Sequence, residues 1–192
     1  RSLVGSEMCI RDRDIKLNSF DIEEGVPMMD TSGENIFDGG EDSQSSQNIE
    51  VIKEGQSKKT IIVGAHYDSA GTHGVDDNGS GVAVALESAL RMIDVETPYT
   101  IKYVFFGAEE KGLLGSRAYV KAHESELSHH LFNMNIDLAG QSLGGTVIGV
   151  TGDSSICRQF EALAEKCGIG MTTRSSVWSS DSNLSLIHIS EP

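Results

Sequence analysis

The hydrophobic positions along the chain alternate between two spacings, which predicts alternating strands and helices. Thr60–Ala65 (TIIVGA) and Thr100–Phe106 (TIKYVFF) are short apolar runs rich in β-branched and aromatic residues, as in buried strands. Between them, Gly79–Ile93 carries apolar residues at the spacing of one helix face. These residues are Val82, Leu86, Ala89, Leu90 and Ile93. The centre of the chain is therefore predicted to form a strand, a helix and a second strand.

The flanking segments extend this alternation. Further strands are predicted at Asn48–Lys53, Phe132–Leu138 and Thr146–Val150, and further helices at Gly112–His123 and Ser154–Lys166, the last ended by Gly168. We expect a hairpin turn at Gly55–Lys59, and an exposed loop over residues 30–47, which are rich in Ser, Asp, Gly and Gln. Strands that alternate with helices favour an α/β sandwich around a largely parallel sheet.

The composition narrows the classes of function. The 192 residues are 38% hydrophobic and 23% charged, ordinary values for one globular domain. The net charge of −14 argues against a nucleic-acid binder, which would carry a basic face. It suits a substrate with a positive end, although a solvated acidic surface explains most of these charges equally well. No apolar run approaches membrane-spanning length, so we expect no membrane segment in this chain.

We expect the two ends of the chain to be foreign to the natural protein. The DNA CTGTCTCTTATACACATCTCCGAGCCC encodes LSLIHISEP, which is residues 184–192, and its reverse complement, read one base in, encodes GSEMCIRD, which is residues 5–12. One oligonucleotide in opposite orientations thus accounts for both ends, and it resembles the transposon adapter used to build sequencing libraries. We therefore expect residues 1–12 and 184–192 to be non-native, and residues 13–183 to be an internal fragment of the natural protein.

Acidic and imidazole side chains gather where predicted strands end or the next helix begins. They are His66, Asp68, Asp76, Asp77, Glu109, Glu110 and Asp137. Because ligands of open α/β sheets bind beyond the carboxyl ends of the strands, these groups are expected to converge although they are scattered in sequence.

Taken singly, each of these residues has a structural explanation. His66 alone is more often a structural histidine, and the pair Asp76–Asp77 before NGSG suits a helix cap. The pair Glu109–Glu110 before Lys111 suits a solvated surface. However, a cap explains one aspartate more easily than two, and adjacent carboxylates behind an apolar strand are costly to bury without a cation. Asp137, inside the apolar FNMNIDLAG, has the same requirement.

As a set, the residues indicate a metal centre. Mixed imidazole and carboxylate ligands suit zinc or a similar divalent ion, and a carboxylate near a ligand imidazole fixes its tautomer. Two such ions that share a bridging carboxylate polarise a carbonyl and generate hydroxide near neutral pH. A further glutamate, not bound to metal, can move the proton from water to a leaving amine.

Four motifs carry a resemblance to a known family. In chain order they are HYDS, DDNGSG, FGAEEKGLLGS and NIDLAG. They are similar to the successive signatures of the M28 family of zinc metallopeptidases, the aminopeptidase group, and the match runs from about Asn48 to Asn183. The resemblance implies a three-layer α/β/α sandwich with a mixed sheet, two divalent ions expected to be zinc, and a peptide substrate with a free N-terminus.

The resemblance also implies a role for each residue. His66 and Asp137 would hold one metal ion, Asp77 would bridge the two ions, and Glu110 would bind the second. Glu109 would be the general base, and Asp68 would orient His66.

One part of the family pattern is incomplete. The second metal of the family also takes a late histidine, well after an S-D-H-like stretch, and here Ser180-Asp181-Ser182 has serine in place of that histidine. The late histidine is expected beyond Asn183, and His188 imitates it but follows Asp181 too closely. We therefore expect this fragment to hold most of the first site and part of the second, and to be inactive although the parent enzyme is active.

The leading functional hypothesis is a metal-dependent exopeptidase, an aminopeptidase. The alternatives are a carboxypeptidase or glutaminyl cyclase of the same family, or a non-catalytic relative that uses the fold for binding. By resemblance alone, the parent protein is expected to be secreted or attached to the cell envelope. Residue preference and oligomeric state do not follow from the sequence.

Overall fold

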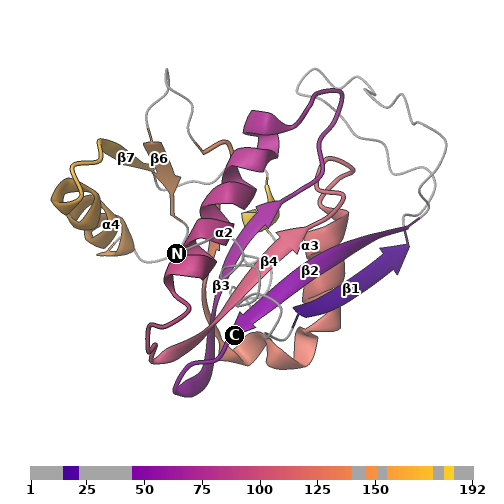
Figure 1. Cartoon of the computed structure of the whole chain (residues 1–192), viewed down its shortest axis with the longest axis horizontal. Coiled ribbons are helices and arrows are strands. Elements are labelled where there is room, and N and C mark those ends of the chain that lie inside the picture. Colours follow the sequence, from indigo (N-terminus) through magenta and orange to yellow (C-terminus); the bar gives the residue numbers. More distant parts are fainter. Residues whose placement is uncertain (1–14, 22–44, 140–145, 151–154, 175–179, 184–192) are drawn as a thin grey trace.

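The centre of the computed structural model is a five-stranded mixed sheet in the order β1-β2-β4-β3-β5 (Figure 1). The structure describes residues 15–21, 45–139, 146–150, 155–174 and 180–183. The five strands are β1 (Ile15–Asp21), β2 (Ser45–Lys53), β3 (Ser57–His66), β4 (Tyr99–Phe106) and β5 (His130–Asn135). The neighbours β1, β2 and β4 pair antiparallel, whereas β4, β3 and β5 pair parallel. The three parallel strands therefore end at one edge of the sheet.

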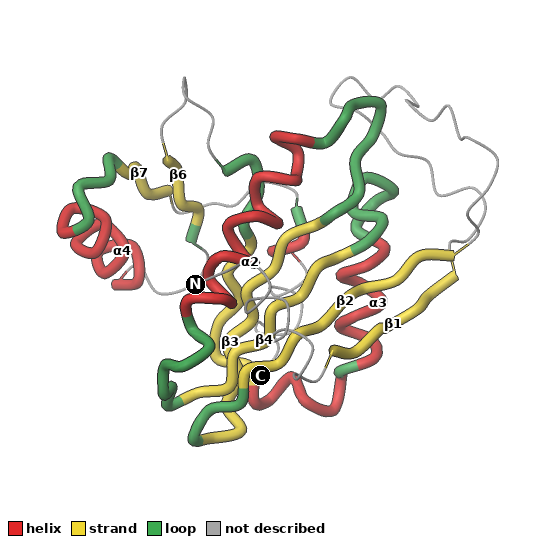
Figure 2. Tube along the Cα trace, viewed as in Figure 1, coloured by secondary structure: helices red, strands yellow, loops and turns green. Residues whose placement is uncertain are grey.

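Helices cover both faces of this sheet. They are α2 (Gly81–Arg91) and α3 (Leu114–Ala122), which lie on opposite sides of it (Figures 1 and 2). Because successive side chains of a strand point to opposite faces, β4 supplies Tyr103 and Phe105 to the core under α2 and Val104 and Phe106 to the core under α3. The expected three-layer α/β/α arrangement is confirmed.

A smaller unit lies beside β5. Its strands β6 (Thr146–Gly149) and β7 (Met171–Arg174) pair parallel, and α4 (Ser155–Lys166) connects them. The ring of Phe160 on α4 stacks on Phe132 of β5 at 6.0 Å between centroids. After α4, Gly168 has a φ of +69°, the left-handed conformation that favours glycine after a helix. Among the described residues, no helix has the length and apolar character that a membrane span requires.

The structure differs from the sequence expectations at several boundaries. The strand predicted at Phe132–Leu138 ends at Asn135, so Asp137 lies beyond the strand and not within it. The proposed turn at Gly55–Lys59 is shorter, because β3 already begins at Ser57. Residues 45–47 of the expected loop belong to β2. The rest of that loop, both expected adapter segments and His188 lie outside the described residues.

A buried polar network joins the sheet to α3 and to the short helix η2 (Glu124–His129). Glu50 on β2 is buried, and its Oε2 lies 3.3 Å from Lys102 Nζ, which also donates to Glu126 Oε2 at 2.9 Å. The hydroxyl of Tyr119 donates to the same Glu50 oxygen. Burial raises the pKa of Tyr119, and the negative charge of Glu50 raises it further, so the phenol stays a donor.

Replacing Tyr119 with phenylalanine is expected to lower the free energy of unfolding by about 1–3 kcal/mol, because the buried Glu50 carboxylate loses a donor. Urea denaturation would measure the change. Tyr103→Phe is the matched control, since the Tyr103 hydroxyl lies 3.2 Å from the neutral Ser88 Oγ and its loss should cost about 1 kcal/mol or less. Equal losses in the two variants would contradict a special role for the charged acceptor.

Candidate metal centre

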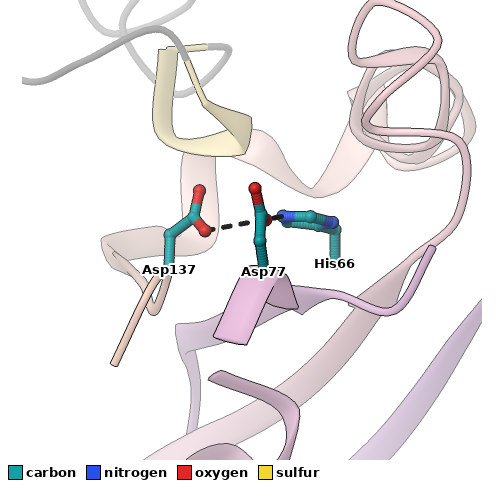
Figure 3. A group of neighbouring side chains, drawn as sticks. All are labelled: His66, Asp77 and Asp137. Carbon is teal, nitrogen blue, oxygen red and sulfur yellow. Dashed lines mark ion pairs between the residues drawn. The ribbon is translucent and has the colours of Figure 1, made fainter. Parts of the chain in front are cut away.

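Three side chains from separate elements converge at the carboxyl end of the parallel strands (Figure 3). His66 is the last residue of β3, Asp77 lies in the turn η1 (Val75–Ser80), and Asp137 follows β5. One ligand atom from each lies within 4.8 Å of the others. His66 Nε2 is 3.1 Å from Asp77 Oδ1 and 3.5 Å from Asp137 Oδ1. The predicted convergence of these three residues is therefore present in the structure.

The ring of His66 is held in one orientation. It is 1% exposed, and its Nδ1 lies 3.1 Å from the carbonyl oxygen of Asp68. A carbonyl only accepts hydrogen bonds, so Nδ1 carries a proton there. In the neutral ring, Nε2 therefore keeps its lone pair and presents it to the space between Asp77 and Asp137.

The charges of this cluster require a cation. Burial lowers the pKa of His66, but its pairing with Asp137 and Asp68 and the nearby carboxylates outweigh burial and raise the pKa to about 11. Burial would raise the pKa of Asp137, but His66 and a hydrogen bond from Ser180 hold it below its usual range. The imidazolium and the carboxylate thus stabilise each other, and a metal ion can replace the proton as the positive charge.

Asn78 fixes the turn that carries Asp77. Its side chain is 1% exposed, and its Nδ2 donates to the carbonyl of Ile136 at 2.9 Å. Its Oδ1 accepts from the amide of Gly81 at 3.0 Å, at the start of α2. This one side chain connects the residues next to Asp77 with the residue before Asp137. Both carboxylates are thereby held near His66 Nε2.

The two glutamates lie beside this group without joining it. The carboxylate of Asp68 accepts hydrogen bonds from the amides of Glu109 at 3.0 Å and Glu110 at 3.1 Å. Burial raises the pKa of Glu109 to about 8, with the negative charges of Asp181, Glu110 and Asp137 adding to this and His66 opposing it. Burial and the charge of Asp77 raise the pKa of Glu110 as well. The charges of the three-residue group therefore act on both glutamate side chains.

The contacts of Asp68 differ in detail from the role expected for it. Its carboxylate oxygen Oδ1 is 3.6 Å from His66 Nδ1, whereas its own carbonyl oxygen is closer. Because the carboxylate is bound to the two glutamate amides, Asp68 connects the His66 segment to the glutamate segment.

Sequence reasoning assigned no role to Ser180 and Asp181, which complete this region. Ser180 Oγ donates to Asp137 Oδ2 at 2.8 Å and accepts from Asn135 Nδ2 at 2.7 Å. Asp181 is 2% exposed and accepts from Ser116 Oγ on α3 at 2.5 Å. Burial raises the pKa of Asp181 to about 6, and the hydrogen bond from Ser116 opposes this. The only sequence signal was the likeness of SDS to an S-D-H stretch.

If Asp137 holds a zinc ion, replacing Ser180 with alanine is expected to weaken zinc binding by about 10–100-fold, the usual cost of losing a hydrogen bond to a metal ligand. Competition against a chromogenic chelator would measure the affinity. Ser182→Ala removes a hydroxyl from the same short helix, η3 (Asp181–Asn183), and should leave the affinity unchanged. Equal affinities for the Ser180 variant and the original protein would show that this hydrogen bond does not support Asp137.

The residues present fit a divalent metal ion. Asp137 Oδ1 is buried and has no hydrogen-bond partner among the described residues, although it faces His66 Nε2. One imidazole nitrogen and two carboxylate oxygens form a donor set that suits zinc. A cation at this point would also supply the missing partner of Asp137 Oδ1.

The chain is similar in sequence and fold to known aminopeptidases. Aminopeptidase YwaD of Bacillus subtilis is 44% identical over 105 residues, which are 52% of this chain and 23% of that protein. The structure of BSAP, a zinc aminopeptidase from Bacillus subtilis, superposes with a TM-score of 0.66 at 35% identity and covers 72% of this chain and 37% of that one. The chain thus spans well under two thirds of these relatives.

A more distant structure shows the same fold. A glutaminyl cyclase from an Acidobacteriales bacterium superposes with a TM-score of 0.72 at 14% identity, over 98% of this chain and 67% of that one. The family model of peptidase family M28 matches residues 48–183, which include all six predicted site residues. With that match over most of its length, and with His66, Asp77 and Asp137 gathered at the ends of its parallel strands, the chain belongs to peptidase family M28.

Proposed function

We propose that the protein is a zinc-dependent aminopeptidase, which removes the N-terminal residue of peptides. The observation that carries the proposal is the convergence of His66, Asp77 and Asp137 within 4.8 Å of one another. The similarity to aminopeptidase YwaD and to BSAP supports the choice of aminopeptidase within the family.

The proposed ligand sets follow from the positions of the side chains. His66 and Asp137 would hold one ion, and Asp77 would bridge to a second ion, because it is the half-exposed member of the group and its charge also acts on Glu110. Glu110 would be a ligand of the second ion. A late histidine, expected beyond Asn183, would complete that site.

When bound, the two ions would polarise the scissile carbonyl and lower the pKa of a water molecule. The chain's own part in the reaction is proton transfer by Glu109. This carboxylate would accept the proton of the attacking water and return it to the leaving amine. Its burial and its acidic neighbours raise its pKa to about 8. A pKa near the working pH suits a group that must both accept and return a proton.

Two measurements test the proposed function. The first is zinc titration of metal-free protein by calorimetry, in which binding that disappears in His66→Ala supports the proposed centre. The second compares aminoacyl-anilides, acyl-glutamates and peptides with N-terminal glutamine as substrates of the whole protein. Turnover of the anilides alone supports an aminopeptidase, whereas turnover of either other class would assign the carboxypeptidase or cyclase alternative. Absence of zinc binding would favour the non-catalytic relative.

Zinc affinity is expected to rise about tenfold for each unit of pH between pH 6 and 8. His66, with a pKa of about 11, holds a proton throughout this range, and the metal requires the neutral ring, so binding releases one proton. Lower pH therefore favours the proton over zinc. Chelator competition at pH 6, 7 and 8, corrected for protonation of the chelator, would measure the slope. An affinity independent of pH would contradict the protonated state of His66.

A further inference from the structure

The segment that carries the two glutamates is a compact, strained turn. This segment, residues 107–115, runs from the end of β4 into the first two residues of α3, and the backbone φ angles of Ala108 and Leu113 are +55° and +61°. A side chain with a Cβ disfavours this left-handed region, so such residues persist only where the surroundings hold them. Inside the turn, the amides of Gly112 and Leu113 donate to the carbonyl of Glu109 at 2.9 and 2.8 Å.

A single buried side chain joins the two ends of this turn. Asn48 on β2 is 0% exposed, and its Oδ1 accepts from the amide of Gly107 at 3.1 Å. Its Nδ2 donates to the carbonyl of Gly115 at 2.8 Å and to Asn18 Oδ1 on β1 at 3.1 Å. The amide side chain thus matches a donor at one end of the turn and an acceptor at the other. An aspartate, which has the same shape, cannot donate to Gly115 when ionised.

The packing around Asn48 shows that the two ends must approach closely. A Cβ added to Gly115 would lie 2.1 Å from the carbonyl oxygen of Gly107 and 2.6 Å from Asn48 Oδ1. A Cβ on Gly107 would lie 2.6 Å from the carbonyl oxygen of Gln47, next to Asn48. Only glycine fits at both positions, so backbone and Asn48 form one closely packed contact.

We propose that Asn48 is a positioning residue for Glu109 and Glu110. By holding the ends of the turn 107–115 together, it fixes the two carboxylates relative to the metal centre, while the Asp68 carboxylate accepts hydrogen bonds from their amides. The two hydrogen bonds between Asn48 and the backbone of Gly107 and Gly115 are called the clamp. The roles of the two carboxylates rest on the proposed function, but the clamp does not.

Residue-resolved hydrogen exchange by NMR tests the clamp. In the original chain, the Gly107 amide should exchange slowly, because its partner is the buried Asn48 Oδ1. In Asn48→Asp, the amides of Glu109 and Glu110 should lose about tenfold in protection, the change expected from one net hydrogen bond, while the β3 amides change much less. Asn18→Ala is the matched control, since it removes the third contact of Asn48 and spares both ends of the turn.

Three results would overturn the clamp. The first is an equal loss of protection in the turn and in β3, which would mean general destabilisation. The second is unchanged exchange at Glu109 and Glu110. The third needs no variant and applies if Asn48→Asp does not fold: exchange of the Gly107 amide at the rate of an unstructured chain. Zinc titration is a separate test, so a chain that shows the exchange pattern without binding zinc would keep the clamp and lose the proposed function.

Discussion

Replacing Glu109 with glutamine is expected to reduce the turnover number of the whole protein by about 100- to 10,000-fold, the usual contribution of a general base. The substitution keeps the size of the side chain and removes its ability to accept a proton. Zinc affinity should change little, because Glu109 is outside the group formed by His66, Asp77 and Asp137. Hydrolysis of an aminoacyl-anilide at saturating substrate, together with zinc content per chain, would measure both quantities.

The neighbouring glutamate supplies the control for this prediction. Glu110→Gln makes the same chemical change one residue away, but the proposed function makes Glu110 a ligand of the second ion. It should therefore lower the zinc content, or the affinity for the second equivalent, in addition to the rate. If the two variants lost rate and zinc alike, the division of roles between base and ligand would be wrong.

The fold was predictable where local pattern and tertiary environment agree. The strands β3 and β4 are buried on both faces, so their apolar runs were visible as such, and α2 has a clear apolar face. The strand β1 was missed because IKLNSFD has no apolar run and its alternation breaks at Asn18-Ser19, so its form depends on pairing with β2 at the edge of the sheet. The strand β7 has four residues and likewise depends on its partner β6.

The candidate site was predictable for a different reason. Ligand positions at the ends of parallel strands follow from topology, so His66, Asp77 and Asp137 were expected to meet although 71 residues separate the first from the last. The supporting residues were not predictable in this way. Ser180 contacts Asp137 across 43 residues of chain, and Asn48 contacts Gly107 across 59. Serine and asparagine are common in loops and strands, and only the folded contacts distinguish these two from the others.

Replacing Asp77 with asparagine is expected to weaken zinc binding by more than about 100-fold, which is the upper range for residues that only support a ligand. As the proposed bridge, Asp77 serves both ions, so the loss should affect both equivalents of zinc in the whole protein. The motif resemblance assigned the bridge to Asp77, but cap chemistry alone does not distinguish it from Asp76. The structure does, because Asp77 Oδ1 lies 3.1 Å from His66 Nε2 and Asp76 is outside the group of three.

This pair of aspartates separates coordination from long-range charge. Asp76→Asn removes the same unit of negative charge from the adjacent residue, which is outside the group of three, so it measures the effect of net charge without loss of a ligand. If Asp77 binds the ions directly, calorimetry should show a large loss of zinc affinity for Asp77→Asn and a change of less than about threefold for Asp76→Asn, because an exposed charge outside the group is screened by solvent. Similar losses in both variants would mean that the acidic field, and not a bridging carboxylate, attracts the metal, and the two-ion centre would then lack the ligand that connects its halves.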